Sequence, residues 1–128
     1  MRAILFSLLF TLSLNLYAET HLILVRHGET DWNQQQRLQG HADIPLNEAG
    51  EAQAQQFAEK VAVAYPDIQA IYSSDLQRAY MTAYVTAEKF HLPVHQKPNL
   101  RELDWGEWDG LSISDPRVQT QRNEEKQL

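Results

Sequence analysis

Apolar segments of two different periodicities alternate along this chain, and that alternation most restricts its fold. His21–Arg26 is a continuous run of branched apolar residues, typical of a strand that is buried on both faces of a parallel sheet. Helical spacing of apolar residues predicts a helix over Asn47–Ala64, with Asn47 as its N-cap. Ala70–Tyr72 is a second short strand, a further helix begins at Asp75 and ends before Pro93, and Val94–Gln96 is a candidate third strand. Strands that alternate with helices predict a βαβ-type fold with a mainly parallel sheet.

Length and composition exclude several classes of protein. The chain has 128 residues, enough for one domain but not for two ordinary ones. With 43% hydrophobic and 22% charged residues it is globular rather than disordered. The net charge of -6 argues against nonspecific nucleic-acid binding, which needs clustered cations. The absence of cysteine excludes disulfides, thiolate catalysis, cysteine-based zinc sites and iron–sulfur clusters.

The N-terminal residues have the order of a secretory signal peptide. Arg2 precedes an apolar run over 4–16, and Ala18 offers a small residue at a cleavage point before Glu19. We therefore expect residues 1–18 to be removed and the protein to be secreted or periplasmic. The run is shorter than the ~20 residues that span a bilayer comfortably, so no stable membrane span is expected after cleavage. An uncleaved membrane anchor and a buried N-terminal helix are the alternatives.

Candidate catalytic residues follow the first predicted strand. In open α/β sheets, ligands bind beyond the carboxyl ends of the strands. Arg26 and His27 stand at such an end, and Gly28 lets the backbone turn sharply and approach a ligand closely. A neutral imidazole is a nucleophile, and a guanidinium binds a tetrahedral anion through its fork of donors. The pair suits attack on phosphorus.

Two further residues have a functional and a structural interpretation. Arg78 lies in the first turn of the second helix, where helix N-termini favour anions; the alternative is a solvated helix arginine. Glu102 stands among leucine and tryptophan residues. Apolar surroundings would raise its pKa and suit it as a general acid. The alternative is an ion pair with Arg101 or another arginine, and the sequence does not decide between them.

Five short blocks follow one another in the sequence. They are Leu24–Asn33 (LVRHGETDWN), Arg37–Gly40 (RLQG), Asp43–Asn47 (DIPLN) with Gly50, Ser73–Ala79 (SSDLQRA) with Thr82 and Ala83, and Leu100–Glu102 (LRE) with Gly106, Glu107 and Gly110. Together they resemble the histidine phosphatase superfamily, in its phosphoglycerate-mutase-like branch. The resemblance covers about His21–Gly110. It implies a three-layer α/β sandwich with a mainly parallel sheet, incomplete at the C-terminus.

The resemblance also implies a role for each matching residue. His27 would be the nucleophile and form a phosphohistidine, and Glu102 would protonate the leaving group and then activate water. The remaining matches concern binding: Arg26, Arg78 and Asn33 would hold the phosphoryl group, while Gln39 and Gly40 would line the substrate pocket. The family needs no metal or other cofactor, and its partner here would be a small phosphorylated substrate rather than a nucleic acid.

One family feature is missing after Glu102. The family has a second catalytic histidine well downstream of the acid, whereas the last histidine here is His95. We therefore interpret residues 19–110 as the N-terminal portion of the domain and residues 111–128 as a polar tail. The function expected is an exported, metal-independent phosphomonoesterase with broad phosphate-ester substrates, with weak or no activity in this chain. The alternatives are a truncated, non-catalytic phosphate-binding remnant and a phosphoglycerate mutase, against which the leader argues.

Overall fold

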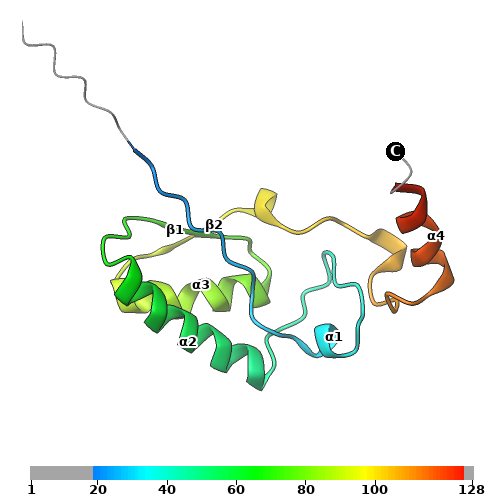
Figure 1. The fold of residues 1–128 in the computed structure, drawn as a ribbon, viewed down its shortest axis with the longest axis horizontal. Helices are drawn as coiled ribbons and strands as arrows, with labels where there is room; N and C mark the ends of the chain where they lie inside the picture. Colours follow the sequence, from blue (N-terminus) through cyan, green and yellow to red (C-terminus); the bar gives the residue numbers. More distant parts are fainter. Residues whose placement is uncertain (1–18, 126–128) are drawn as a thin grey trace, which may run out of the picture.

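The computed structural model describes residues 19–125, with side chains up to Thr120 (Figure 1). The predicted signal peptide lies outside the described residues. Among the residues described, no helix is long and apolar enough to cross a membrane. The elements are α1 (Asp31–Gln34), α2 (Glu48–Ala64), β1 (Ile71–Ser73), α3 (Gln77–Phe90), β2 (Val94–Gln96), the 3-10 turns η1 (Pro98–Leu100) and η2 (Gly106–Trp108), and α4 (Pro116–Glu125).

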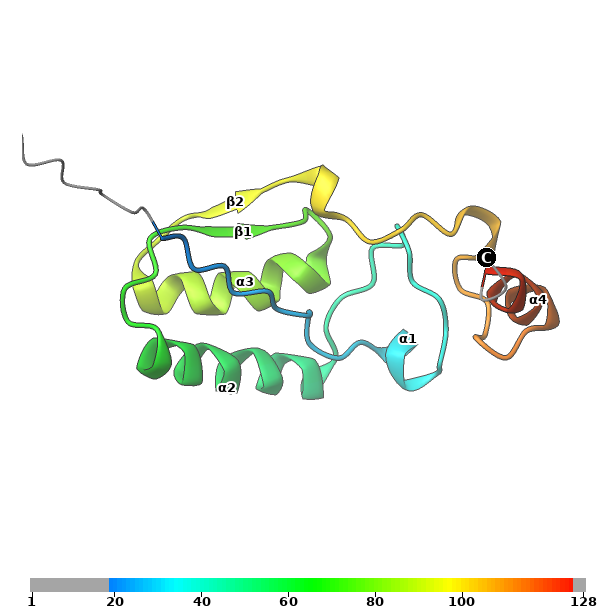
Figure 2. The same cartoon turned by 45° about the horizontal axis from the view of Figure 1, so that its top comes forward.

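The two strands form a parallel pair with helices on one side. Ile71 is in register with Val94, and Ser73 with Gln96. Helix α3 packs against both strands, and α2 packs against α3. Figure 2 shows both helices on the same side of the strands. The predicted parallel α/β character is confirmed, and β2 has the predicted bounds.

The helices begin where their capping groups allow. The Asn47 side chain accepts a hydrogen bond from the Gly50 amide at 2.9 Å, so the predicted N-cap of α2 is confirmed. Helix α3 begins two residues later than Asp75, and its own N-cap residue offers no side-chain bond. Asp43 replaces the missing cap from a distant loop: its carboxylate accepts from the Gln77 amide at 2.7 Å.

The first predicted strand is absent from the structure. His21–Arg26 is extended, but among residues 19–125 no backbone hydrogen bond joins it to β1 or β2. Its apolar side chains, predicted to be buried, are largely exposed; Leu24 is 86% exposed. A run of apolar residues becomes a strand only where a neighbouring strand pairs with its backbone. The sequence pattern indicated burial, but the described part of the chain does not supply the partner.

Two glycines fix the end of this extended segment against the helices. A Cβ atom on Gly50 would lie 2.0 Å from the carbonyl oxygen of Glu29, and one on Gly28 would lie 2.5 Å from the carbonyl oxygen of Gly50. The Gly28 amide also donates to the Thr82 hydroxyl of α3 at 3.0 Å. The backbone next to His27 is therefore held between the first turn of α2 and the side of α3.

Residues 111–118, which we grouped with the polar tail, pack against the preceding part of the chain. The backbone amide of Leu38 donates to the Leu111 carbonyl at 2.9 Å, and the Gly110 amide donates to the Leu38 carbonyl at 2.8 Å. Val118 of α4 is 2% exposed. One buried valine and a short backbone bridge place this segment against the rest of the chain.

Candidate active site

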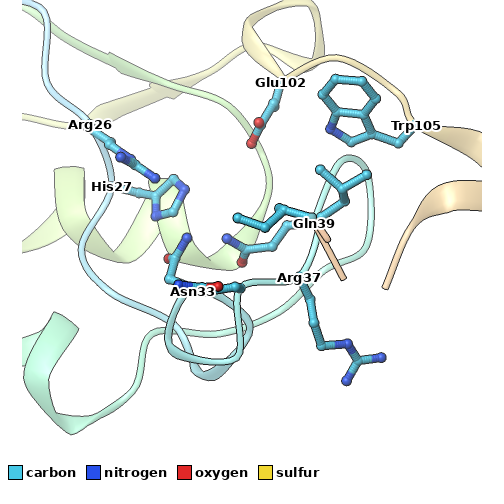
Figure 3. Close-up of a pocket in the computed structure, with 10 residues that line it drawn as sticks. Arg26, His27, Asn33, Arg37, Gln39, Glu102 and Trp105 are labelled. Carbon is cyan, nitrogen blue, oxygen red and sulfur yellow. The ribbon is translucent and has the colours of Figure 1, made fainter. Parts of the chain in front are cut away.

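Five of the seven site residues predicted from the sequence line one cavity of about 470 Å³ (Figure 3). They come from four separate parts of the chain: the end of the extended segment, α1, the loop after α1, and the segment after η1. These five are Arg26, His27, Asn33, Gln39 and Glu102. The other two, Gly40 and Arg78, do not line the cavity but are hydrogen-bonded to each other beside it.

His27 is held with one ring nitrogen committed to the backbone. Its Nδ1 lies 2.7 Å from the carbonyl oxygen of Gly28, which only accepts, so Nδ1 holds the proton of the neutral ring. Nε2 then has the free lone pair that a nucleophile needs. Burial lowers the pKa of His27 below its ordinary value of 6.5, and the nearby Arg78 and Arg26 cations lower it further. At pH 7 the imidazole is therefore neutral.

The lowered pKa of His27 predicts a pH dependence of both titration and stability. In the unfolded chain the ring binds a proton at a higher pH than in the folded one, so the free energy of unfolding falls as pH drops below about 6.5. Above that pH this contribution is complete. We expect NMR to give a titration midpoint below 6.5 for His27. Below pH 6.5 the wild type should lose stability relative to His27→Asn, which has no imidazole to protonate. An NMR titration midpoint at or above 6.5 would contradict a lowered pKa for His27.

Arg78 is buried, which excludes the alternative of a solvated helix arginine. It is 1% exposed. Its two terminal nitrogens donate to the carbonyl oxygens of Ala42 and Gly40, each at 2.7 Å. Gly40 has a positive φ of 48° and no space for a side chain, so this loop is built around the guanidinium. Arg78 thus places a positive charge near His27 and fixes the loop that follows Gln39.

Glu102 is paired with an arginine rather than surrounded by apolar groups. Its carboxylate lies 3.6 Å from the Arg78 guanidinium, and its side chain is 48% exposed. The apolar surroundings predicted for it are therefore wrong for the described residues, and the ion-pair alternative is confirmed. Its partner is Arg78, because Arg101 donates through Nε and Nη2 to the two carboxylate oxygens of Asp75.

His41, which follows Gly40, connects its loop by a hydrogen bond to the segment that contains Glu102. Its Nε2 lies 2.9 Å from the carbonyl oxygen of Glu102, and its Nδ1 lies 3.6 Å from the carboxylate of Asp104. No local sequence pattern connects His41 with Glu102, since 61 residues separate them. The contact arises because the loop and the segment cross beside Arg78.

Removing the His41 ring should loosen the segment that holds Glu102. We expect His41→Ala to accelerate amide hydrogen exchange over residues 101–105, while the free energy of unfolding falls by only about 1 kcal/mol because the bond is exposed. His41→Gln, whose side-chain amide can donate to the same carbonyl, is the matched control and should restore most of the protection. Equal exchange in the wild type and His41→Ala would show that the contact does not order the segment.

Thr30 is a site residue that the sequence did not single out. It is fully buried and is the N-cap of α1. Its hydroxyl lies 2.7 Å from Oε1 of Gln39, and its backbone amide donates to Oδ1 of Asn33 at 3.1 Å. The capping box between Thr30 and Asn33 was the available sequence signal, since threonine is a favoured N-cap.

The described residues offer no cluster for a metal ion: within residues 19–125, no three His, Cys, Asp or Glu side chains gather suitably. The polar side chains that line the cavity with His27 are those of two arginines, three amides and one carboxylate. Together with the parallel strands and helices, they define an α/β protein whose cavity combines a neutral imidazole with donors for an anion.

Comparison with known proteins identifies the family. The sequence model of the histidine phosphatase superfamily (branch 1) matches residues 22–127. The chain belongs to this superfamily.

Relatives and solved structures agree with this assignment. The chain is 45% identical over 96 residues to the uncharacterized phosphatase PhoE of Bacillus subtilis, covering 75% of this chain and 49% of that protein. It is 51% identical over 83 residues to the probable phosphoglycerate mutase GpmB of Proteus mirabilis, covering 65% and 38%. A mycobacterial glucosyl-3-phosphoglycerate phosphatase solved with VO3 superposes with a TM-score of 0.67 and 38% identity, over 74% of this chain and 47% of that one. The chain thus spans about half the length of the proteins it matches, and its fold is phosphoglycerate-mutase-like.

Proposed function

We propose that this chain contributes the phosphoryl-binding half of a metal-independent phosphomonoesterase that acts through a phosphohistidine at His27. The observation that supports this most directly is the state of His27: a neutral ring, with Nδ1 bonded to a carbonyl and Nε2 free, in a cavity that Arg26 also lines. Cationic and amide donors can balance the charge of a phosphoryl group without a metal ion.

The proposed reaction has two steps. Nε2 of His27 attacks phosphorus and the ester P–O bond breaks, while the half-exposed Glu102 transfers a proton taken from water to the departing oxygen. Water then attacks the phosphohistidine, Glu102 takes a proton from it, the P–N bond breaks, and inorganic phosphate leaves. The 3.6 Å separation between Glu102 and Arg78 keeps this carboxyl group beside a cation near the nucleophile.

The far wall of the cavity supports a broad choice of leaving group. Leu38, Trp105 and Ile113 line it. Arg37, which also lines the cavity, has its guanidinium engaged elsewhere: it lies over the Trp32 ring at 4.3 Å and donates to the Gly110 carbonyl at 2.7 Å. Figure 3 shows this guanidinium directed away from His27. A largely apolar wall suits phosphate esters of varied alcohols.

We extend the proposal to an exported enzyme on the basis of residues 1–18, which have the order of a signal peptide.

Mass spectrometry of the chain after incubation with a phosphodonor tests the proposal. We expect one added phosphate on His27 and slow release of p-nitrophenol from p-nitrophenyl phosphate without added metal, because the second catalytic histidine of the family has no counterpart after Glu102. The His27→Asn variant should show neither. An unmodified wild-type chain that still binds phosphate would indicate a non-catalytic phosphate-binding module instead. The mutase alternative would appear as interconversion of phosphoglycerates rather than release of inorganic phosphate.

A further inference from the structure

Thr30 lies between two of the amide side chains that line the cavity, Asn33 and Gln39 (Figure 3). Its own side chain is fully buried, whereas Asn33 and Gln39 both reach the cavity. Asn33 belongs to α1, which Thr30 caps, and Gln39 belongs to the loop that follows. Thr30 therefore contacts the oxygen end of each amide.

The hydrogen bonds determine which end of each amide faces the cavity. The Thr30 hydroxyl has one proton and two acceptors within reach, Oε1 of Gln39 at 2.7 Å and Oδ1 of Asn33 at 3.0 Å. Asn33 has a second donor, so the proton goes to the shorter contact with Gln39. The backbone amide of Thr30 supplies the donor for Oδ1 of Asn33 at 3.1 Å. The hydroxyl oxygen accepts in turn from the Asn33 backbone amide at 3.2 Å. Both carbonyl ends are thereby satisfied inside the protein, and both NH2 groups are left for the cavity.

We propose that Thr30 is a positioning residue, which holds the Gln39 amide with its NH2 group toward the phosphoryl group. The inference rests on the proposed function, because it assumes that an anion occupies the cavity. A primary amide that rotates by half a turn presents its oxygen instead, and that oxygen would repel an anion. The buried hydroxyl opposes this alternative: a turned amide could still donate to the hydroxyl oxygen, but Oε1 would then lose its 2.7 Å donor and face the anion.

The two amides should respond differently to loss of the hydroxyl. Asn33 keeps the Thr30 backbone donor whatever side chain stands at position 30. Gln39 depends on the hydroxyl itself. The positioning effect is therefore specific to Gln39, whereas the capping effect on α1 acts through Asn33 and changes mainly stability.

Binding of methylphosphonate, a non-hydrolysable phosphate mimic, to the full chain tests the proposal by calorimetry. Thr30→Val has nearly the shape of threonine and should lower the affinity about tenfold, as expected when a donor to an anion is lost. Thr30→Ser keeps the hydroxyl and should bind as the wild type does. In a Gln39→Met background, which has no amide to orient, adding Thr30→Val should change the affinity less than twofold.

Each outcome separates the inference from the function on which it rests. A wild-type chain that does not bind methylphosphonate overturns both. Wild-type binding with equal affinity in Thr30→Val, or an equal loss in the Gln39→Met background, overturns the positioning role alone. NMR of the wild type gives a second measurement that does not depend on the valine variant folding. The Gln39 NH2 protons should shift on addition of methylphosphonate, and unmoved protons would contradict the proposal.

Discussion

Replacing Arg78 with alanine should reduce methylphosphonate affinity about 100-fold and lower the free energy of unfolding by about 3 kcal/mol. The affinity falls because the positive charge near His27 is lost, and because the loop around Gly40 loses the hydrogen bond that holds it. The stability falls because the carbonyl oxygens of Gly40 and Ala42 lose charged donors inside the protein. Calorimetry and urea unfolding give the two quantities.

Arg117→Ala is the matched control for this substitution. Arg117 pairs with Asp115 at 2.9 Å on the surface, so its loss should leave both stability and binding nearly unchanged. Arg78→Met keeps the stem and removes only the charged head. If this variant folds and binds methylphosphonate as the wild type does, Arg78 has a structural role alone.

The second large effect is expected at Gly50. Gly50→Ala should cost about 3 kcal/mol or prevent folding, because the new methyl group would meet the Glu29 carbonyl at 2.0 Å and backbone atoms on both sides cannot move independently. In any fraction that folds, displacement of Glu29 would also shift His27, so methylphosphonate affinity should fall. Thermal unfolding and calorimetry measure these changes.

Gly106→Ala separates steric from conformational cost. Gly106 has a positive φ of 56°, but no atom lies within 4 Å of the position that its Cβ would take. We therefore expect a loss of about 1 kcal/mol from backbone conformation alone. Equal losses at Gly50 and Gly106 would show that the crossing of Glu29 over α2 is not as tight as the structure places it.

Local pattern predicted most of the elements. Apolar spacing and an Asn47 cap predicted α2, and short apolar segments between helices predicted β1 and β2, because these signals act over a few neighbouring residues. The strand at His21–Arg26 was predicted from the same kind of signal and is absent. A strand depends on a partner elsewhere in the chain, and no local pattern states whether that partner is present.

The sequence by itself determined the family and the order of its motifs, and with them the identities of the residues around the cavity. Only the tertiary structure decided what each residue contacts. It paired Glu102 with Arg78 instead of an apolar pocket, and it placed Thr30 between two amides. Residue type and spacing fix the chemistry that a group offers, whereas burial, charge and hydrogen-bond partners come from segments far apart in sequence, which meet only when the chain folds.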